Sequence, residues 1–306
     1  MLTMLAPMAG YTDRAMRDLC RSYDADVVYT EMINAYTVMR TPEKAMQLLG
    51  IDGELHPIAA QLFGSDPDML AQAAQRLESW GVDHIDLNAG CPVKKVVSIG
   101  AGASLLTDLP LFTTCVQALR KAITTARFSV KIRAGWNDRH LVHTEIGKIV
   151  SDIGIDHITI HARTRDDGFS GVPNLDYITE LKQSSTVPVI GNGNITSRSD
   201  AEDMVNQTGC DGVMIGRGAI GRPWLFTEIK EQKDLQPDMQ AVINMVLTLY
   251  HEKARLYSEK TAVVEMRKTL PFFIRGWDHA KQIRVAVNKT VTIKDVEEVL
   301  TCGHVC

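Results

Sequence analysis

The chain of 306 residues has few aromatic residues, no strong excess of one charge and no long apolar run. Phe, Trp and Tyr make up 6% of the residues, against 22 Gly and 13 Met, and this composition favours an aliphatic α/β core over a β-sandwich. The formal net charge of −4 gives no general attraction to nucleic acids or membranes, so a polyanion would need a local basic patch. With 45% hydrophobic residues the chain can bury a large core, which excludes a disordered or fibrous protein.

The sequence also lacks the cysteine spacing of a disulfide framework and the apolar length of a membrane segment. The cysteines are scattered, with no Cys-x-x-Cys pair: Cys20, Cys91, Cys115, Cys210, Cys302 and Cys306. No basic stretch precedes the apolar start of the chain, and no run has the length of a membrane span. We therefore expect a soluble, reduced, cytoplasmic protein. The terminal Cys302-Gly-His304-Val-Cys306 offers only three candidate ligands, so we expect no metal site.

Eight short aliphatic runs recur along the chain, each bounded by turn residues. They cover residues 2–7, 26–31, 57–62, 83–88, 128–133, 156–161, 187–191 and 211–216, with helix-like periodicity between them, as in 67–80, 110–124 and 199–208. This alternation predicts parallel strands joined by crossover helices, and eight such units close into a (β/α)8 TIM barrel. An open doubly wound sheet is the alternative, but no Gly-x-Gly-x-x-Gly follows the first strand.

Several of these strands alternate polar and apolar residues. In 83–88, Ile85 and Leu87 share one parity while His84, Asp86 and Asn88 share the other, and 128–133 and 156–161 alternate in the same way. The apolar set should face the surrounding helices, so the polar set should point into the barrel. Because ordinary barrel interiors prefer branched aliphatic residues, polar positions near the strand ends predict a site at the C-terminal mouth.

The last part of the chain has a different composition. A polar linker at 231–238 separates a predicted barrel, residues 1–235, from a predicted helical domain, residues 240–306. Residues 241–306 carry 10 Lys and Arg against 7 Asp and Glu. Between 253 and 289 the basic residues are Lys253, Arg255, Lys260, Arg267, Lys268, Arg275, Lys281, Arg284 and Lys289. Such a face suits a polyanion, although charge alone does not distinguish it from a solvated helix surface.

Three loops at strand ends carry residues suited to chemistry. Gly191-Asn-Gly-Asn194 and Gly216-Arg-Gly218 follow the last two strands, where TIM barrels often bind a phosphate through backbone N–H groups. Asn88-Ala-Gly-Cys-Pro92 follows the fourth strand and places Cys91 over the mouth. A thiol there could act as a nucleophile or as a proton donor, and the absence of a paired His favours the donor.

Together these segments resemble the bacterial tRNA-dihydrouridine synthases, FMN enzymes that reduce uridine in the tRNA D-loop. The motifs that carry the resemblance are Ala6-Pro-Met-Ala-Gly10 with Thr12-Asp-Arg14, Ala60-Gln-Leu-Phe-Gly64, Asn88-Ala-Gly-Cys-Pro92, Val130-Lys-Ile-Arg-Ala-Gly-Trp136, Ile160-His-Ala-Arg-Thr164, Asn192-Gly-Asn194 and Ile215-Gly-Arg-Gly218. They span the barrel, and a weaker match continues into Met266-Arg-Lys268.

The resemblance implies a role for individual residues. Cys91 is implied as the proton donor, and Asn88, Arg133 and Arg163 as contacts to the uracil or nearby RNA. Implied FMN contacts are Pro7, Met8, Ala9, Gln61, Lys131 and His161 around the ring and its tail, and Asn192, Gly193, Asn194, Gly216 and Arg217 around the phosphate. The family commonly has an acidic residue at the position of Asn194, so this loop departs from the pattern.

The resemblance also implies the reaction. NADPH reduces FMN, the flipped uridine stacks on the flavin, hydride passes from N5 to uracil C6, and Cys91 protonates C5. The implied partner is tRNA, bound by the helical domain, without an obligate protein partner or a membrane. One alternative is an FMN-dependent enzyme acting on a free pyrimidine, similar to dihydroorotate or dihydropyrimidine dehydrogenase, which would not need the basic helices. Another is a non-enzymatic RNA-binding protein that keeps the barrel as a scaffold.

Overall fold

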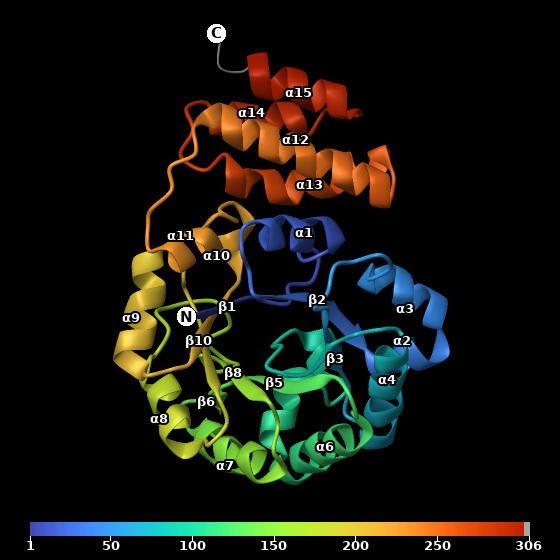
Figure 1. The fold of residues 1–306 in the computed structure, drawn as a ribbon, viewed down its shortest axis with the longest axis vertical. Helices are drawn as coiled ribbons and strands as arrows, with labels where there is room; N and C mark the ends of the chain where they lie inside the picture. Colours follow the sequence, from blue (N-terminus) through green and yellow to red (C-terminus); the bar gives the residue numbers. More distant parts are fainter. Residues whose placement is uncertain (303–306) are drawn as a thin grey trace.

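The computed structural model describes residues 1–302 and contains a closed parallel barrel of eight strands. Figure 1 shows the barrel with its surrounding helices and, beside it, the C-terminal helices. The barrel strands are β1 (Leu2–Leu5), β2 (Val27–Asn34), β3 (Ala59–Phe63), β4 (His84–Ala89), β5 (Arg127–Arg133), β8 (His157–His161), β9 (Val189–Asn192) and β10 (Gly212–Ile215). Each coincides with one of the eight runs in the sequence, so the predicted TIM barrel is confirmed.

Helices follow the strands and cover the outside of the barrel. The longer ones are α1 (Arg14–Ser22), α4 (Pro67–Ser79), α6 (Leu109–Ala122), α7 (His143–Ile153), α8 (Asp176–Ser184) and α9 (Arg198–Thr208). Many begin at a side chain that accepts a hydrogen bond from the first turn, as Asp66 does for α4 and Ser197 does for α9. Shorter helices are α2 (Ala35–Arg40), α3 (Pro42–Leu49), α5 (Lys94–Val97), a 3-10 turn at Gly102–Thr107, α10 (Arg217–Ile220) and α11 (Leu225–Glu231).

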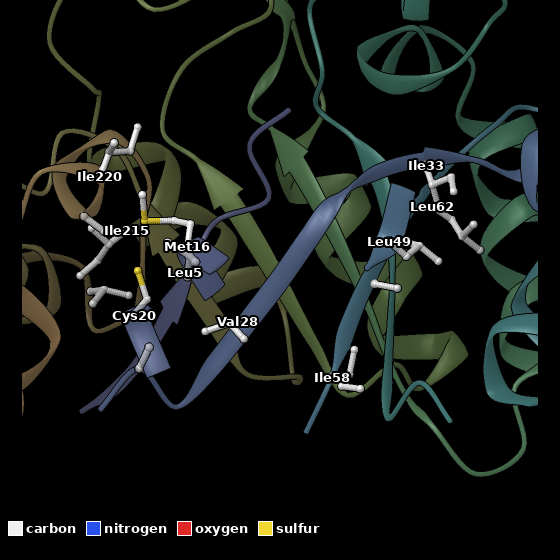
Figure 2. Packing of buried hydrophobic residues seen from close by; sticks show 14 of the residues in the cluster. Leu5, Met16, Cys20, Val28, Ile33, Leu49, Ile58, Leu62, Ile215 and Ile220 are labelled. Carbon is white, nitrogen blue, oxygen red and sulfur yellow. The ribbon is translucent and has the colours of Figure 1, made fainter. Parts of the chain in front are cut away.

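The alternation in the strands has the predicted orientation. Ile85, Leu87 and Val130 belong to the large apolar core between the strands and the helices. Figure 2 shows part of this core, where Leu5 and Ile215 lie near side chains of α1. A separate small cluster of Met4, Ala6, Tyr29, Ala59, Ile190 and Met214 packs apart from it. The polar residues His84, Asp86 and Ser129 are almost completely buried and hydrogen-bond to one another inside the barrel.

The chain after the barrel is helical, as expected. It forms α12 (Met239–Leu256), α13 (Glu259–Phe273), α14 (Ala280–Val287) and α15 (Ile293–Cys302). Val246 and Leu300 of this region belong to the same continuous apolar core as the barrel. The helices therefore share a packed interface with the barrel, and α12 contacts α1 directly. Among residues 1–302, no helix is both long and apolar enough to cross a membrane.

A buried ion pair joins the helical region to the barrel. The Lys253 ammonium of α12 pairs with Asp13, the residue that caps α1, and lies 3.4 Å from Glu265 of α13. The Lys253 side chain is 3% exposed and that of Asp13 is 10% exposed. Both charges have left water, so each depends on the other for stabilisation.

We predict that Lys253→Met lowers the free energy of unfolding by about 3 kcal/mol, because Asp13 stays buried without its cation. Urea denaturation of the full-length protein measures the loss. The control is Arg255→Met, which removes an exposed partner of Glu252 and should cost about 0.5 kcal/mol. Equal losses in the two variants would contradict the role given to the buried pair.

Candidate functional site

A row of amide side chains links the barrel interior to the Cys91 loop. The Gln61 Nε2 group donates to Asp86 Oδ2 at 2.7 Å, and Asn88 Nδ2 donates to Gln61 Oε1 at 2.7 Å. The Asn88 Oδ1 atom accepts the N–H groups of Gly90 at 3.1 Å and Cys91 at 2.9 Å. The structure therefore brings together Gln61, Asn88 and Cys91, three of the residues implied by the resemblance.

The Cys91 thiol lies in a loop whose backbone packs closely against Gly102. A Cβ atom at Gly102, where φ is +60°, would lie 2.8 Å from the Cys91 carbonyl oxygen, so this approach requires glycine. Burial raises the pKa of the Cys91 thiol, while Arg133 and Lys131 oppose this effect. The thiol consequently keeps its proton at neutral pH, which suits a proton donor.

Lys131 lies between the amide row and the glycine loops. Its ammonium donates to Asn192 Oδ1 at 3.1 Å, and Asn192 Nδ2 in turn donates to the Met214 carbonyl at 2.7 Å. Burial and the neighbouring Arg133 lower the pKa of Lys131 to about 8, although Asp86 acts in the opposite direction. The group is therefore mostly cationic at neutral pH and costs free energy to bury.

The two glycine loops lie side by side at the ends of β9 and β10. A Cβ atom at Gly218 would be 2.1 Å from the Ile195 carbonyl, so the loops meet backbone to backbone. At Gly216 a Cβ would make only ordinary van der Waals contacts, the nearest at 3.5 Å to Met8 Sδ. Gly193 and Asn194 both have positive φ, of 145° and 53°. These loops form a glycine-lined cradle, and the exposed Arg217 follows the second loop with its guanidinium over the Phe169 ring.

The chain leaving β1 forms a tight turn beside this cradle. The Met8 carbonyl accepts the N–H groups of Tyr11 and Thr12, and the Met8 N–H donates to Thr12 Oγ1 at 3.0 Å. Pro7 and Met8 are partly buried and Ala9 is exposed. This turn therefore holds one side of the mouth rigidly.

Arg133 and Arg163 occupy positions that the sequence alone did not indicate. Arg133 is almost completely buried; its Nε donates to the Gly90 carbonyl at 2.9 Å and its Nη1 to the Thr164 carbonyl at 2.7 Å. Arg163 donates to the Ser170 carbonyl and lies 3.1 Å from His161 Nε2. Both guanidinium groups hold the loop after β8 in place by donating to its backbone carbonyls. That they contact RNA stays a prediction.

Burial and the surrounding cations lower the pKa of His161 far below its ordinary value, so its imidazole is neutral.

One residue of the site was not singled out from the sequence, and another was placed without its partners. Phe169, 59% exposed, lies in the loop after β8, with the guanidinium carbons of Arg217 and Arg133 at 5.2 and 5.4 Å from its ring centre. No periodicity marks a loop aromatic. Asp86 was placed on the inward face by its parity, but its partners Gln61 and Ser129 come from other strands.

Some basic residues of the helical region are engaged within the fold, and others are exposed. Lys253 is buried against Asp13, and Arg267 donates to the Thr290 carbonyl at 3.0 Å, so these two serve the fold. Exposed basic residues on and around α14 are Arg275, Lys281, Arg284 and Lys289, while the exposed Lys268 of α13 lies over the Tyr11 ring, 5.8 Å from its centre. Lys281 and Lys289 line a shallow depression on the surface of α14.

The described residues contain no group of three or more His, Cys, Asp and Glu side chains that could hold a metal ion. The side chains of Cys302, His304 and Cys306 lie outside the described part of the chain.

These features define a TIM-barrel enzyme whose polar side chains and glycine loops gather at the carboxyl ends of the strands. The chain belongs to the dihydrouridine synthase family, whose model matches residues 4–304. It is 35% identical over 291 residues to tRNA-dihydrouridine synthase B of Pseudomonas aeruginosa, covering 94% of this chain and 87% of that protein. A probable tRNA-dihydrouridine synthase of Rickettsia bellii is 33% identical over 301 residues, covering 95% and 92%. The family resemblance seen in the sequence is confirmed.

Solved structures agree on the fold. Morphinone reductase in complex with tetrahydroNAD has a TM-score of 0.54 at 13% identity, covering 78% of this chain and 89% of that one. Histamine dehydrogenase from Rhizobium sp. 4-9 has a TM-score of 0.58 at 15% identity, covering 82% of this chain and 48% of that one. At these identities the likeness shows a common barrel fold.

We predict a pH dependence from Lys131. Its folded pKa of about 8 lies below the ordinary 10.5, so between these values the unfolded chain binds more protons and stability rises with pH. Relative to Lys131→Met, wild type should gain up to about 3 kcal/mol in free energy of unfolding from pH 8 to 10.5. Urea denaturation of flavin-free protein measures this, with exposed Lys94→Met as the control. A wild-type minus Lys131→Met difference that stays constant with pH would rule out a buried ammonium at this position.

Proposed function

We propose that the chain is a flavin-dependent tRNA-dihydrouridine synthase that reduces a D-loop uridine, with FMN as cofactor and NADPH as reductant. The observation that carries the proposal is the Cys91 thiol, protonated and anchored through Asn88, at a mouth that also holds Lys131 and the glycine cradle. Support comes from the family match, which extends through the helical region to residue 304. That extent favours tRNA over the free-pyrimidine alternative.

The residues at the mouth fit a flavin nucleotide. The cradle at Gly193, Asn194, Gly216 and Arg217 suits a phosphate, and Thr159 Oγ1 is buried on β8, beside Lys131 on β5, without a partner. Asn192 also belongs to the phosphate side, while Pro7, Met8, Ala9, Gln61, Lys131 and His161 would contact the ring and its tail. When bound, FMN supplies the hydride that uracil C6 receives. We propose FMN as the particular flavin and NADPH as the reductant.

The chain's own residues supply the proton and the orientation. Cys91 donates its proton to uracil C5, and the resulting thiolate is stabilised by the nearby charges of Lys131 and Arg133, which oppose the rise in the thiol pKa caused by burial. Asn88 holds the backbone on both sides of the thiol in place. Arg133 donates to the Gly90 carbonyl, so it fixes the same loop from the other side, and from there it would contact the uracil or nearby RNA.

The helical region supplies the surface for tRNA. The exposed cations Arg275, Lys281, Arg284 and Lys289 are available for phosphate contacts, which position a nucleic acid without reading its bases. The buried salt bridge between Lys253 and Asp13 connects this region with the turn after β1. A tRNA held there can therefore place one flipped nucleotide at the mouth in a fixed orientation.

We predict that Cys91→Ala lowers dihydrouridine formation at least about 100-fold, because a positioned general acid is lost. The variant should still bind FMN and oxidise NADPH. Mass spectrometry of the product tRNA and absorbance of NADPH measure the two activities. Cys115→Ala, which removes a buried thiol of α6, is the control and should keep both. Normal dihydrouridine formation by Cys91→Ala would disprove the proton-donor role.

We predict that the combined variant Arg275→Ala, Lys281→Ala and Arg284→Ala binds tRNA more weakly. The slope of log affinity against log salt should decrease by about 2, since three phosphate contacts are lost. Filter binding across a salt series measures this, and flavin content should not change. Arg255→Ala, whose guanidinium already pairs with Glu252, serves as the control. An unchanged slope in the triple variant would place the tRNA surface elsewhere.

A further inference from the structure

The resemblance implies no role for Asp86, yet this residue is completely buried inside the barrel. Its Oδ1 atom accepts from Ser129 Oγ at 2.5 Å and its Oδ2 atom accepts from Gln61 Nε2 at 2.7 Å. Asp86 is therefore the point where two hydrogen-bonded chains meet. One chain leads through Gln61 and Asn88 to Cys91, and the other leads through Ser129 to His84.

The chain toward Cys91 has a fixed polarity. An ionised carboxylate can only accept hydrogen bonds, and the N–H groups of Gly90 and Cys91 can only donate them. The two amides between these ends, Gln61 and Asn88, must each present an N–H2 group toward Asp86 and an oxygen toward the Cys91 loop. A flip of either amide would place two donors or two acceptors against each other.

The other chain can reverse its polarity: Ser129 donates to the ionised Asp86 and accepts from His84, but both groups can exchange these roles. Ser129 Oγ lies 2.8 Å from His84 Nε2, and Tyr29 Oη lies 3.5 Å from His84 Nε2 and 3.2 Å from His157 Nε2. A hydroxyl can donate or accept, and a neutral imidazole can change tautomer, so this side adapts to a change at Asp86. Substitution of Asp86 should therefore disturb the hydrogen bonds of Gln61 and Asn88 more than those of His84 and Tyr29.

We propose that Asp86 is a positioning residue: it sets the orientation of the Gln61 and Asn88 amides, and through them holds the Gly90–Cys91 backbone in place for proton donation. The proposal rests on the role of Cys91 in the proposed function. It also fixes the orientation of the Gln61 amide, because its oxygen accepts from Asn88 and its Nε2 group donates to Asp86. Asp86 thus acts on the reaction through three intermediate residues and touches neither substrate nor cofactor.

Two substitutions separate the hydrogen bond from the charge. Asp86→Asn keeps an acceptor, because its oxygen can face Gln61 while its N–H2 donates to Ser129, whose hydroxyl then turns to His84. Asp86→Ala leaves Gln61 Nε2 unpaired, so the Gln61 side chain is no longer held and Asn88 Nδ2 loses a fixed acceptor. Tyr29→Phe is the matched control, since it removes a buried hydroxyl from the opposite chain and leaves the amide row intact.

The test is the rate at which iodoacetamide alkylates Cys91 in the full-length protein prepared without flavin, followed by mass spectrometry of the Cys91 peptide. In Asp86→Ala, Asn88 still accepts from the Gly90 and Cys91 N–H groups, but its Nδ2 group loses an acceptor held in place by Asp86. The loop should therefore be held less firmly, and Asp86→Ala should react about fivefold faster than wild type. Asp86→Asn and Tyr29→Phe should react within about twofold of wild type. With flavin and tRNA, Asp86→Ala should lower kcat while the KM for tRNA stays near that of wild type.

An Asp86→Ala protein that is folded, yet alkylates at the rate of Tyr29→Phe, would overturn the proposal. If Asp86→Ala does not fold, the double variant Asp86→Leu, Gln61→Leu takes its place. It replaces the buried pair by apolar side chains and still removes the hydrogen-bond acceptor of Asn88 Nδ2. Alkylation of that protein at the wild-type rate would also overturn the proposal. Because alkylation needs neither tRNA nor NADPH, its outcome stands apart from the proposed function. Failure of wild type to form dihydrouridine would refute the function and leave the alkylation result in force.

Discussion

The need to satisfy polar groups that are buried inside a closed barrel governs the rest of the structure. The inward face of β4 carries His84, Asp86 and Asn88 where most barrels have aliphatic side chains, and each must find a partner away from water. The partners come from neighbouring strands: Ser129 of β5 and Gln61 of β3. The result is a continuous hydrogen-bonded row that reaches the Cys91 loop, so the interior of the barrel fixes the geometry of its mouth.

A second link runs from the mouth to the helical region. The turn after β1 is held by Glu31, which accepts the Gly10 N–H at 2.7 Å, and by Asp13, which pairs with Lys253 of α12. Tyr11 of the same turn packs edge-on against Phe272 of α13 with ring centres 5.9 Å apart. The barrel and the C-terminal helices share one apolar core, so the surface proposed for tRNA and the wall proposed for the flavin are parts of one packed unit.

The sequence predicted the features that depend on local pattern. All eight barrel strands, the inward parity of β4 and the helical character after Asp238 follow from periodicity and turn residues, and Cys91 was found because its loop is constrained by Gly90 and Pro92. The hairpin of β6 (Gly135–Asn137) and β7 (His140–Leu141) was missed, since strands this short carry almost no periodicity. Contacts between segments that are distant in the sequence could not be predicted either, because local pattern does not show which segments meet. Lys253 and Arg267 were counted with the surface cations, although both have internal partners, and Arg133 and Arg163 bind backbone carbonyls of a loop whose path no pattern indicates.

The central claim is that this mouth reduces a uridine of tRNA with the help of Cys91 and a flavin. The most direct measurement incubates tRNA that lacks dihydrouridine but carries its other natural modifications with the FMN-loaded protein and NADPH, and maps dihydrouridine along the tRNA by mass spectrometry. The account predicts dihydrouridine at a defined position of the D-loop, and none when NADPH is omitted. Bound FMN and steady NADPH oxidation without any dihydrouridine, in a tRNA that carries its other natural modifications, would contradict the account.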